Sequence, residues 1–324
     1  MPFAIRFHQT GGPEVLRWEE VAVGEPAPGE VRVRHEAVGL NYIDTYHRSG
    51  LYPLPLPSGL GKEAAGVVEA LGEGVSEFRV GDRVTYAGGP LGAYAQVRCL
   101  PAKVLLKLPE AIDCPTGAAM TLQGLTAAYL LRRTCRVQAG DTVLIHAAAG
   151  GVGLIACQWA KALGATVIGT VSTDAKAEIA RQNGCDHVVL YSRENVPVRV
   201  RELTAGAGVT VVYDGVGKDT FLPSLDCLRS RGMMVTFGNA SGAVPPFDPL
   251  LLSQKGSLFV TRPKLDDYTT TRDELVQLGQ ELFDVVLSGK VKVAVNQTYP
   301  LAEAANAHRD LEARKTTGST ILLP

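Results

Sequence analysis

One stretch of the chain decides the fold, and it reads Asp141-Thr-Val-Leu-Ile-His-Ala-Ala-Ala-Gly-Gly-Val-Gly-Leu-Ile-Ala-Cys-Gln-Trp-Ala-Lys161. The apolar run Thr142–His146 predicts a buried strand, and the small residues Ala147–Gly151 predict a turn after it. With so few side-chain atoms in the way, backbone N–H groups can approach an anion closely. An apolar helix begins at the turn and directs the positive end of its dipole there. The stretch therefore predicts a phosphate-binding strand-turn-helix unit.

The turn departs at one position from the usual dinucleotide fingerprint G-x-G-x-x-G. Ala148, Gly150 and Gly153 occupy the three glycine positions, so the first glycine is missing. A glycine-rich turn alone can be no more than a tight loop, but a strand before it and a helix after it favour a nucleotide site. We expect the backbone at Gly151 and Val152, where the helix begins, to bind the phosphates together with Ala148 and Gly150.

The alternation of strand and helix continues after this unit. Short apolar runs predict strands, and helical spacing between them predicts helices. The predicted strands are Thr166–Val171, His187–Leu190, Val209–Asp214, Met233–Phe237 and Ser257–Val260, and the predicted helices are Asp174–Asn183, Pro197–Thr204 and Lys218–Leu228. Strands alternating with helices in this way are typical of a doubly wound parallel sheet, which binds its ligands at the carboxyl ends of the strands.

The regions on either side of this pattern have a different character. Before about residue 120, β-rich stretches separated by glycine and proline turns predict an irregular barrel. Towards the C-terminus, Thr271–Ser288 and Leu301–Arg314 predict helices, and Thr320-Ile-Leu-Leu predicts a strand. We expect this part to rejoin the first region, so that the nucleotide domain is inserted into a discontinuous partner. The cleft between the two domains is then the expected place for chemistry.

Composition and charge narrow the class of protein. With 324 residues, 46% of them hydrophobic, the chain can bury large cores in two domains of ordinary size. Its 32 basic and 33 acidic residues leave a net charge of −1, which gives no electrostatic attraction for nucleic acid or anionic lipid. No apolar run approaches the roughly eighteen residues of a membrane span, and the N-terminus lacks the apolar core of a signal peptide, so we expect a cytoplasmic protein. The six cysteines lack Cys-x-x-Cys spacing, which argues against a disulfide framework or a structural zinc site.

Several further motifs, together with the stretch at 141–161, carry a family resemblance that extends over nearly the whole chain. They are Val38-Gly-Leu-Asn-Tyr-Ile-Asp, Ser49-Gly-Leu-Tyr-Pro, Gly66-Val-Val, Val80-Gly-Asp-Arg-Val, Gly92-Ala-Tyr, Val212-Tyr-Asp-Gly-Val-Gly and Gly232-Met-Met-Val-Thr-Phe-Gly. On these motifs the chain resembles the zinc-independent quinone oxidoreductases, the branch of the medium-chain dehydrogenase/reductase superfamily that includes zeta-crystallin.

The resemblance implies an architecture and an assembly. It implies an α/β fold in which a Rossmann doubly wound parallel sheet at residues 123–263 is inserted into a discontinuous GroES-like β-barrel catalytic domain, formed by residues 1–122 and 264–324. It also implies a dimer or a tetramer, of which we expect a homodimer. The apolar Leu258-Phe-Val could provide an edge strand for pairing between subunits, although the same residues suit an internal strand.

The residues at the expected metal positions differ from those of zinc-dependent relatives. Such relatives hold the metal with a Cys or Ser in an early loop, a Gly-His-Glu motif and a later Cys or Asp. This chain has Asn41 in the loop, and Gly61-Lys62-Glu63 replaces the Gly-His-Glu. Because an ammonium group has no lone pair to donate to zinc, we predict neither a catalytic nor a structural metal. The acceptor must then be electrophilic by itself.

The cofactor preference depends on the residues after the second predicted strand of the nucleotide domain. Folds that choose NAD usually place an Asp or Glu there to bind the ribose 2′-hydroxyl. Here Val171 falls at about this position, followed by Ser172 and Thr173, with Lys176 one helical turn later. Two hydroxyls and an ammonium favour the 2′-phosphate of NADPH. Asp174 lies close and could meet the ribose, but its place in the first helical turn favours capping of the helix.

The resemblance implies further cofactor contacts, each at a matching position of this chain. They are Tyr191 near the adenosine phosphate; Gln123 and Thr126 near the phosphates and ribose; Gly215, Phe237 and Gly238 on the nicotinamide side; and Val260, Arg262 and Arg314 closing around the cofactor. Gln123 replaces a lysine of some relatives, but its amide can still donate to a phosphate oxygen. Tyr191 could equally be a packing residue, and Arg314 a solvated helix residue.

Three side chains are candidates to bind the acceptor and to meet the negative charge that develops on its oxygen. Asn41 can donate through its amide, and Tyr46 can donate through its phenol to this oxygen or to the nicotinamide carboxamide; we count both as cofactor ligands as well. Tyr52, on a proline-stiffened segment, offers an aromatic face for a flat ring. All three could instead pack the barrel. His146 is expected to be a neutral, hydrogen-bonded imidazole without a catalytic role.

These features favour an NADPH-dependent quinone reductase. It would reduce its acceptor either by one-electron transfer through a semiquinone or by two-electron transfer. The nearest alternative is NADPH-dependent reduction of an enone or enal double bond, which the sequence does not separate from quinone reduction. A second alternative is a non-catalytic, NADPH-regulated RNA-binding protein, because the zeta-crystallin group includes lens proteins and RNA binders. Balanced charge and the lack of Lys/Arg runs interleaved with aromatic residues argue against nucleic acid. We therefore expect a small-molecule quinone or enone as the partner.

Overall fold

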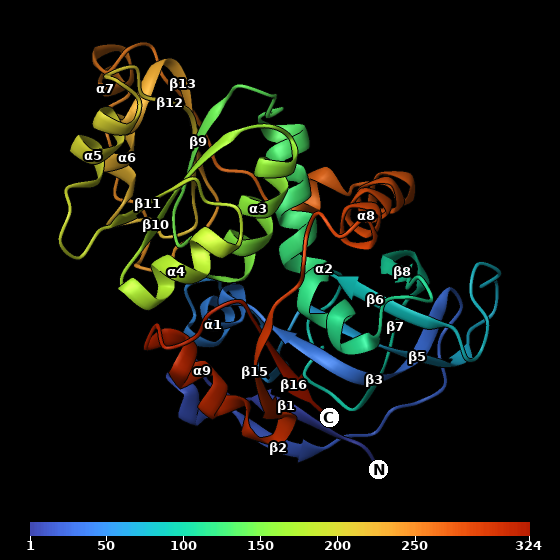
Figure 1. The fold of residues 1–324 in the computed structure, drawn as a ribbon. Coiled ribbons are helices and arrows are strands. Elements are labelled where there is room, and N and C mark those ends of the chain that lie inside the picture. The colour runs from blue at the N-terminus through green and yellow to red at the C-terminus, as the bar shows by residue number, and fades with distance from the viewer. The chain divides into compact units, whose positions relative to one another are not determined.

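The computed structural model describes all residues from Met1 to Pro324, and their contacts divide the chain into two compact units (Figure 1). Unit 1 comprises Met1–Leu125, Thr269–Phe283 and Val293–Pro324, and unit 2 comprises Thr126–Tyr268 and Asp284–Lys292. Unit 2 is therefore inserted into the chain of unit 1.

A single parallel sheet of six strands forms the centre of unit 2 (Figure 1). Its strands are β9 (Thr142–Ile145), β10 (Thr166–Val171), β11 (His187–Leu190), β12 (Val209–Asp214), β13 (Leu228–Thr236) and β14 (Phe259–Thr261). They lie in the order β11-β10-β9-β12-β13-β14, so the chain moves outward from β9 to one side, returns, and moves outward to the other. This order confirms the predicted doubly wound Rossmann sheet, and it places the carboxyl ends of β9 and β12 next to each other.

Helices connect these strands, and their boundaries follow local backbone chemistry. They are α3 (Gly151–Ala162), α4 (Asp174–Gln182), α5 (Val196–Leu203), α6 (Phe221–Cys227) and α7 (Leu250–Gln254). The strands β10, β11 and β12 have the predicted bounds, whereas β13 begins at Leu228 rather than at Met233. The helix α6 begins at Phe221 rather than at Lys218, with Thr220 as its N-cap.

Unit 1 is built on two β-sheets. The smaller sheet has the order β2-β1-β4, and the larger has the order β15-β16-β3-β5-β6-β8, with β7 also paired to β3. The strands are β1 (Phe3–Phe7), β2 (Arg17–Glu20), β3 (Glu30–Leu40), β4 (Ser58–Gly59), β5 (Glu63–Leu71), β6 (Arg83–Ala87), β7 (Val97–Pro101), β8 (Leu105–Lys107), β15 (Val295–Pro300) and β16 (Ser319–Leu323). The remaining helices are α1 (Tyr42–Ser49), α2 (Cys114–Tyr129), α8 (Arg272–Leu287) and α9 (Ala304–Glu312), and the unit boundaries at Leu125 and Phe283 fall within α2 and α8.

The long strand β3 organises unit 1 because it pairs with β5, β7 and β16. Its end, Val38–Leu40, is antiparallel to Thr320–Leu322, so the C-terminal part of the chain rejoins the first part, as the sequence predicts. The predicted helix Leu301–Arg314 is shorter in the structure, where a 3-10 turn at Leu301–Glu303 precedes α9. None of the helices is both long and apolar enough to span a membrane.

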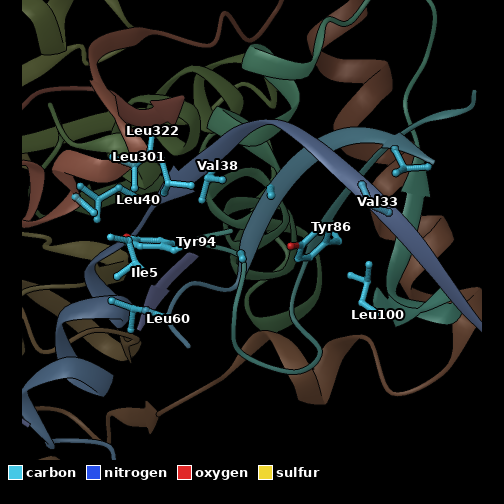
Figure 2. Close-up of a cluster of buried hydrophobic side chains, with 14 of the residues drawn as sticks. Ile5, Val33, Val38, Leu40, Leu60, Tyr86, Tyr94, Leu100, Leu301 and Leu322 are labelled. Carbon is cyan, nitrogen blue, oxygen red and sulfur yellow. The ribbon is translucent and has the colours of Figure 1, made fainter. Parts of the chain in front are cut away.

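Figure 2 shows the hydrophobic core of unit 1, in which two tyrosines carry hydroxyl groups among aliphatic side chains. Tyr86 and Tyr94 are completely buried. The Tyr86 hydroxyl is 3.0 Å from Nε2 of His35, and the Tyr94 hydroxyl donates to Oδ2 of Asp44 at 3.0 Å. Buried hydroxyl groups need such partners because they have lost those of water. The core of unit 1 therefore contains a polar network as well as apolar packing.

Candidate functional site

The predicted phosphate turn lies at the carboxyl end of β9. Ala147 has a left-handed φ of +52°, and the N–H of Ala148 donates to the carbonyl oxygen of Thr170 at 3.1 Å, which ties the turn to β10. The helix α3 has Gly150 as its N-cap, and no side chain caps it. The N–H groups at its first residues, Gly151–Gly153, therefore have no acceptor inside the helix. They are donors suited to an anion.

The two glycines of the fingerprint differ in the space around them. A Cβ on Gly150 would meet only the carbonyl oxygen of Ala147, at 3.2 Å. A Cβ on Gly153 would lie 2.3 Å from the same oxygen and 2.8 Å from Cα of Ala148. In dinucleotide sites the second glycine allows close approach of the pyrophosphate and the third allows close packing of the helix. The turn therefore fits a dinucleotide, with the space at Gly150 available for the ligand.

The residues predicted for the 2′-phosphate gather where β10 ends and α4 begins. Thr173 is the N-cap of α4, and its Oγ1 accepts a hydrogen bond from the N–H of Lys176 at 3.3 Å. The cap is thus Thr173 rather than Asp174, because Asp174 is already the first helical residue. Tyr191 joins this region through its N–H, which donates to the carbonyl oxygen of Val171 at 3.2 Å, and its side chain is 43% exposed.

Asp174 forms an ion pair with a residue that sequence analysis missed. Two nitrogens of the Arg193 guanidinium lie 2.6 and 3.1 Å from the two carboxylate oxygens of Asp174. A bidentate arginine compensates the negative charge that would otherwise face a 2′-phosphate. A basic residue just after Tyr191, at the end of the neighbouring strand, was the available signal in the sequence.

A buried carboxylate shapes the loop predicted on the nicotinamide side. Asp214, at the end of β12, is completely buried. Its Oδ1 accepts hydrogen bonds from the N–H groups of Val216 at 2.8 Å and Gly217 at 3.2 Å, and from Oγ1 of Thr220 at 2.8 Å. These bonds fix the loop that contains Gly215. Sequence analysis assigned no role to Asp214, although an acidic residue at the end of an apolar strand and before Gly-Val-Gly is a readable signal.

Five predicted cofactor residues lie at or near the carboxyl ends of β12, β13 and β14. A Cβ on Gly215 would lie 3.1 Å from the ring of Phe237, and one on Gly238 would lie 2.2 Å from the carbonyl oxygen of Gly215. The guanidinium of Arg262 donates to the carbonyl oxygen of Gly238 at 2.8 Å. Val260 lies within β14. This edge of the sheet is where doubly wound folds bind ligands.

In unit 1, four buried polar side chains form a hydrogen-bonded chain. Nδ2 of Asn41 donates to Oε2 of Glu63 at 2.6 Å, and Nε2 of Gln123 donates to Oδ1 of Asn41 at 3.3 Å. Oγ of Ser319 donates to Oε1 of Gln123 at 2.6 Å, and the N–H of Leu122 donates to Oε1 of Glu63 at 2.6 Å. The structure thus joins Asn41 to Gln123 and adds Glu63 and Ser319, which sequence analysis missed. The amide of Gln123, predicted near the phosphates, is engaged in this chain.

Glu63 is completely buried at the start of β5, and its surroundings leave no spare room. A Cβ on Gly39 would lie 2.2 Å from Oε2 of Glu63 and 2.3 Å from the carbonyl oxygen of Ala118, so only glycine fits there. Burial raises the pKa of Glu63 to about 8, although the hydrogen bonds from Asn41 and Leu122 favour its charged form.

The two tyrosines predicted to contact the acceptor also lie together in unit 1. The rings of Tyr46 and Tyr52 meet edge to face with centroids 5.3 Å apart, and the N–H of Tyr52 donates to the carbonyl oxygen of Tyr46 at 3.1 Å. Tyr42 is the next ring, 6.1 Å from Tyr46. Burial raises the pKa of Tyr42 and the positive charge of Arg314 opposes this, so Arg314 lies near the same cluster.

A second buried chain anchors α1, the helix that carries Tyr46. Asp44 accepts hydrogen bonds from the N–H of Asn41 at 2.9 Å and from the hydroxyl of Tyr94 at 3.0 Å. The Tyr94 oxygen is 3.1 Å from Nε2 of His308, and Nδ1 of His308 is 2.9 Å from a guanidinium nitrogen of Arg48. Since Arg48 can only donate, Nδ1 accepts and Nε2 carries the proton. Burial and Arg48 lower the pKa of His308 to about 3, which keeps this imidazole neutral.

Both ring nitrogens of His146 lie within hydrogen-bond distance of a side-chain hydroxyl group. Nδ1 of His146 is 2.9 Å from Oγ1 of Thr170, Nε2 is 2.8 Å from Oγ of Ser224, and burial lowers its pKa. The imidazole is therefore neutral and hydrogen bonded, as the sequence predicts. No group of three or more His, Cys, Asp or Glu side chains is arranged to hold a metal ion. Thr126 is buried in α2, and its predicted contact with the cofactor stays a prediction.

Comparison with known proteins identifies the family. Two family models match the chain, an alcohol dehydrogenase GroES-like domain at residues 27–110 and a zinc-binding dehydrogenase at residues 151–277. A quinone oxidoreductase of Pseudomonas aeruginosa is 56% identical over 99% of both chains, and a 2-haloacrylate reductase of Burkholderia sp is 50% identical over 100% of this chain and 99% of its own. The solved structure of Escherichia coli quinone oxidoreductase complexed with NADPH has a TM-score of 0.98 and 53% identity, covering 99% of this chain and 100% of that one. With identity of this extent over the full length, the chain belongs to the quinone oxidoreductase family of the medium-chain dehydrogenase/reductase superfamily.

Proposed function

We propose that this protein is an NADPH-dependent quinone reductase of the zinc-independent, zeta-crystallin-like branch. The observation that carries the proposal is the uncapped first turn of α3 beside the space at Gly150, which fits a pyrophosphate. The E. coli relative of the same fold is solved with NADPH, and close relatives are quinone oxidoreductases. Ser172, Thr173 and Lys176 supply hydroxyls and a positive charge at the end of β10, which suits the extra phosphate of NADPH.

We assign different residues to binding of the cofactor, to binding of the acceptor and to stabilisation of the developing charge. Bound NADPH would supply the hydride. Asp214 holds the loop at Gly215 in one conformation, and we assign this loop to the nicotinamide. We assign the amide of Asn41 and the phenol of Tyr46 to the acceptor oxygen, where hydrogen-bond donors stabilise developing negative charge. The ring of Tyr52 is assigned to the flat face of a quinone. No step needs a metal, because a quinone is already electrophilic.

A comparison of acceptors tests this function. Steady-state kinetics with 1,4-benzoquinone, 9,10-phenanthrenequinone and a simple alkenal, each with NADPH, should give the highest kcat/KM for a quinone. The 2-haloacrylate reductase relative favours conjugated alkenes as the second candidate, so a haloacrylate belongs in the same panel. A large preference for an alkene over both quinones would reverse the two assignments. Loss of turnover after treatment with a chelator would contradict the metal-free mechanism.

Replacement of Lys176 by alanine should weaken NADPH binding and spare NADH. The ammonium is assigned to the 2′-phosphate, which NADH lacks, and a hydrogen bond between charged groups contributes about 1.5–3 kcal/mol, or roughly a tenfold change in Kd or more. Isothermal titration calorimetry with both cofactors gives the two constants. Lys161→Ala is the control because it removes another lysine of the same unit, an exposed one that pairs with Asp186. Equal losses for NADPH and NADH would remove Lys176 from the 2′-phosphate site.

Replacement of Tyr46 by phenylalanine should lower kcat by roughly a hundredfold, the usual effect of removing one donor to a developing oxyanion. The ring and its packing against Tyr52 are retained in this variant, so the change reports on the hydroxyl. Tyr42→Phe removes a hydroxyl from the neighbouring ring and serves as the control. Unchanged turnover of every acceptor by Tyr46→Phe would exclude the hydroxyl from the reaction.

The assembly, domain boundaries and location are also proposals. We propose a homodimer formed through the edge strand β14, where Phe259 is 57% exposed, and light scattering at micromolar concentration checks it. A monomer would contradict it.

We keep the boundaries 123–263 for the nucleotide domain and 1–122 with 264–324 for the catalytic domain. We also propose a cytoplasmic location and a small-molecule substrate, with no nucleic acid or membrane partner.

A further inference from the structure

The chain of buried groups from Glu63 to Ser319 has one definite direction when Glu63 is ionised. The N–H of Leu122 can only donate, and it faces Oε1 of Glu63. An ionised carboxylate can only accept, so Asn41 must turn its Nδ2 towards Oε2 of Glu63. Oδ1 of Asn41 then accepts from Gln123, and Oε1 of Gln123 accepts from Ser319, as the structure shows. Every member of the chain is satisfied in this direction.

The same positions also satisfy the opposite direction when Glu63 carries a proton. Its hydroxyl then donates to Oδ1 of Asn41, whose Nδ2 donates to Oε1 of Gln123, and both side-chain amides are turned over. Nε2 of Gln123 donates to Oγ of Ser319, and this hydroxyl needs one acceptor for its own hydrogen. The carbonyl oxygen of Ala119, 2.7 Å from Oγ of Ser319, is that acceptor. One proton taken up from solvent therefore reverses the chain without leaving a buried polar group unpaired.

We propose that Glu63 is a positioning residue whose protonation sets the direction of this chain, and with it the orientation of the Asn41 amide and the charge behind it. The proposal rests on the proposed function in that it takes Asn41 to face the acceptor oxygen. Glu63 itself touches neither cofactor nor acceptor and acts through Asn41.

The charge that the reaction creates decides whether protonation of Glu63 raises or lowers kcat/KM. Hydride transfer to a quinone places negative charge on the acceptor oxygen, and an ionised Glu63 behind Asn41 opposes it. The protonated form, which burial favours by raising the pKa of Glu63 to about 8, is then the more active one. As pH rises through this pKa, kcat/KM should fall.

Other titratable groups face Glu63 from the elements around it. Asp44 faces it from α1, Tyr86 from β6 and Tyr94 from the loop that follows, and Lys62 is its neighbour in the chain. Burial raises the pKa of both tyrosines, so they stay neutral over the range in which Glu63 titrates. Burial also raises the pKa of Asp44 to about 7, so Asp44 needs a control of its own.

The decisive variant is Glu63→Gln, which has nearly the shape of a protonated glutamate. Its amide oxygen accepts from Leu122 and its NH₂ group donates to Oδ1 of Asn41, so it holds the reversed direction at every pH. We expect the kcat/KM of the wild-type enzyme for 1,4-benzoquinone to fall by roughly tenfold across the pKa of Glu63, the effect of about 1.4 kcal/mol of charge repulsion. Glu63→Gln should show no such fall. Asp44→Asn should keep the fall but move it to lower pH, because Asp44 raises the pKa of Glu63.

A measurement without turnover separates this proposal from the proposed function. In ¹⁵N NMR spectra of the full chain, the side-chain NH₂ signals of Asn41 and Gln123 should move with pH in the wild-type protein and stay fixed in Glu63→Gln. Wild-type signals that do not move across the range, or a Glu63→Gln variant that keeps the fall in kcat/KM, would overturn the proposal. If Glu63→Gln does not fold, the wild-type signals still decide. A wild-type protein that binds no NADPH refutes the proposed function and leaves this NMR test intact.

Discussion

Replacement of Gly150 by alanine is expected to reduce NADPH affinity by roughly a hundredfold, the loss of about two charge-assisted hydrogen bonds, while the folded protein keeps its stability. In the free protein the new methyl group would meet only the carbonyl oxygen of Ala147, at 3.2 Å, which needs a shift of a few tenths of an ångström. The same methyl group would occupy the space assigned to the pyrophosphate and keep it away from the N–H groups at Gly151–Gly153. Calorimetric titration with NADPH and thermal unfolding of the same sample measure the two quantities.

Gly153→Ala should behave differently and makes a useful comparison. Its Cβ would lie 2.3 Å from the carbonyl oxygen of Ala147 and 2.8 Å from Cα of Ala148, and a shift large enough to relieve both backbone contacts would displace the turn. We expect a stability loss of about 1–3 kcal/mol, typical of overpacking, in addition to weaker binding. Gly24→Ala is the control, because a Cβ there would have no neighbour within 4 Å. If Gly150→Ala bound NADPH as tightly as the wild-type protein, the turn would not be the pyrophosphate site.

The second large effect is expected at Asp214. Asp214→Ala removes the acceptor of the N–H groups of Val216 and Gly217 and of the hydroxyl of Thr220, so we expect the free energy of unfolding to fall by about 3 kcal/mol or more. The loop at Gly215 would lose its fixed conformation, and NADPH affinity should fall as well. Differential scanning calorimetry with and without NADPH measures both effects.

Asp214→Asn tests whether the hydrogen bonds or the charge are responsible. Its Oδ1 can still accept from Val216 and Gly217, and its NH₂ group can donate to Oγ1 of Thr220, so most of the stability should return. An alanine variant as stable as the asparagine variant would show that these buried hydrogen bonds contribute little.

The sequence predicted the nucleotide unit well because its signals are local. The strands β10, β11 and β12 are short apolar runs bounded by polar or glycine residues. The local sequence is therefore enough to predict where each of these strands begins and ends. The N-cap of α4 was less clear, because Thr173 and Asp174 are adjacent and both residue types cap helices. Only the backbone shows that Thr173 precedes the first helical residue.

The buried chain in unit 1 could not be predicted in the same way. Ser319 and Gln123 are 196 residues apart in the chain and meet only because β16 pairs with β3. Glu63 stands in the sequence as a single acidic residue before a run of small apolar ones, a place where an exposed strand end is the usual expectation. Its burial follows from Gly39 on the neighbouring strand, and that pairing is a property of the fold.

The pairing of β16 with β3 also constrains how the chain matures on the ribosome. β3 emerges early and can pair with β5 on one edge, but the other edge of its end at Val38–Leu40 has no partner until residues 320–322 have been synthesised. All of unit 2 is translated in between, and its parallel sheet uses only its own strands. Unit 2 can therefore acquire its native structure first, while one edge of β3 waits unpaired and exposed to other nascent chains. Slow elongation through the inserted unit would lengthen this vulnerable interval.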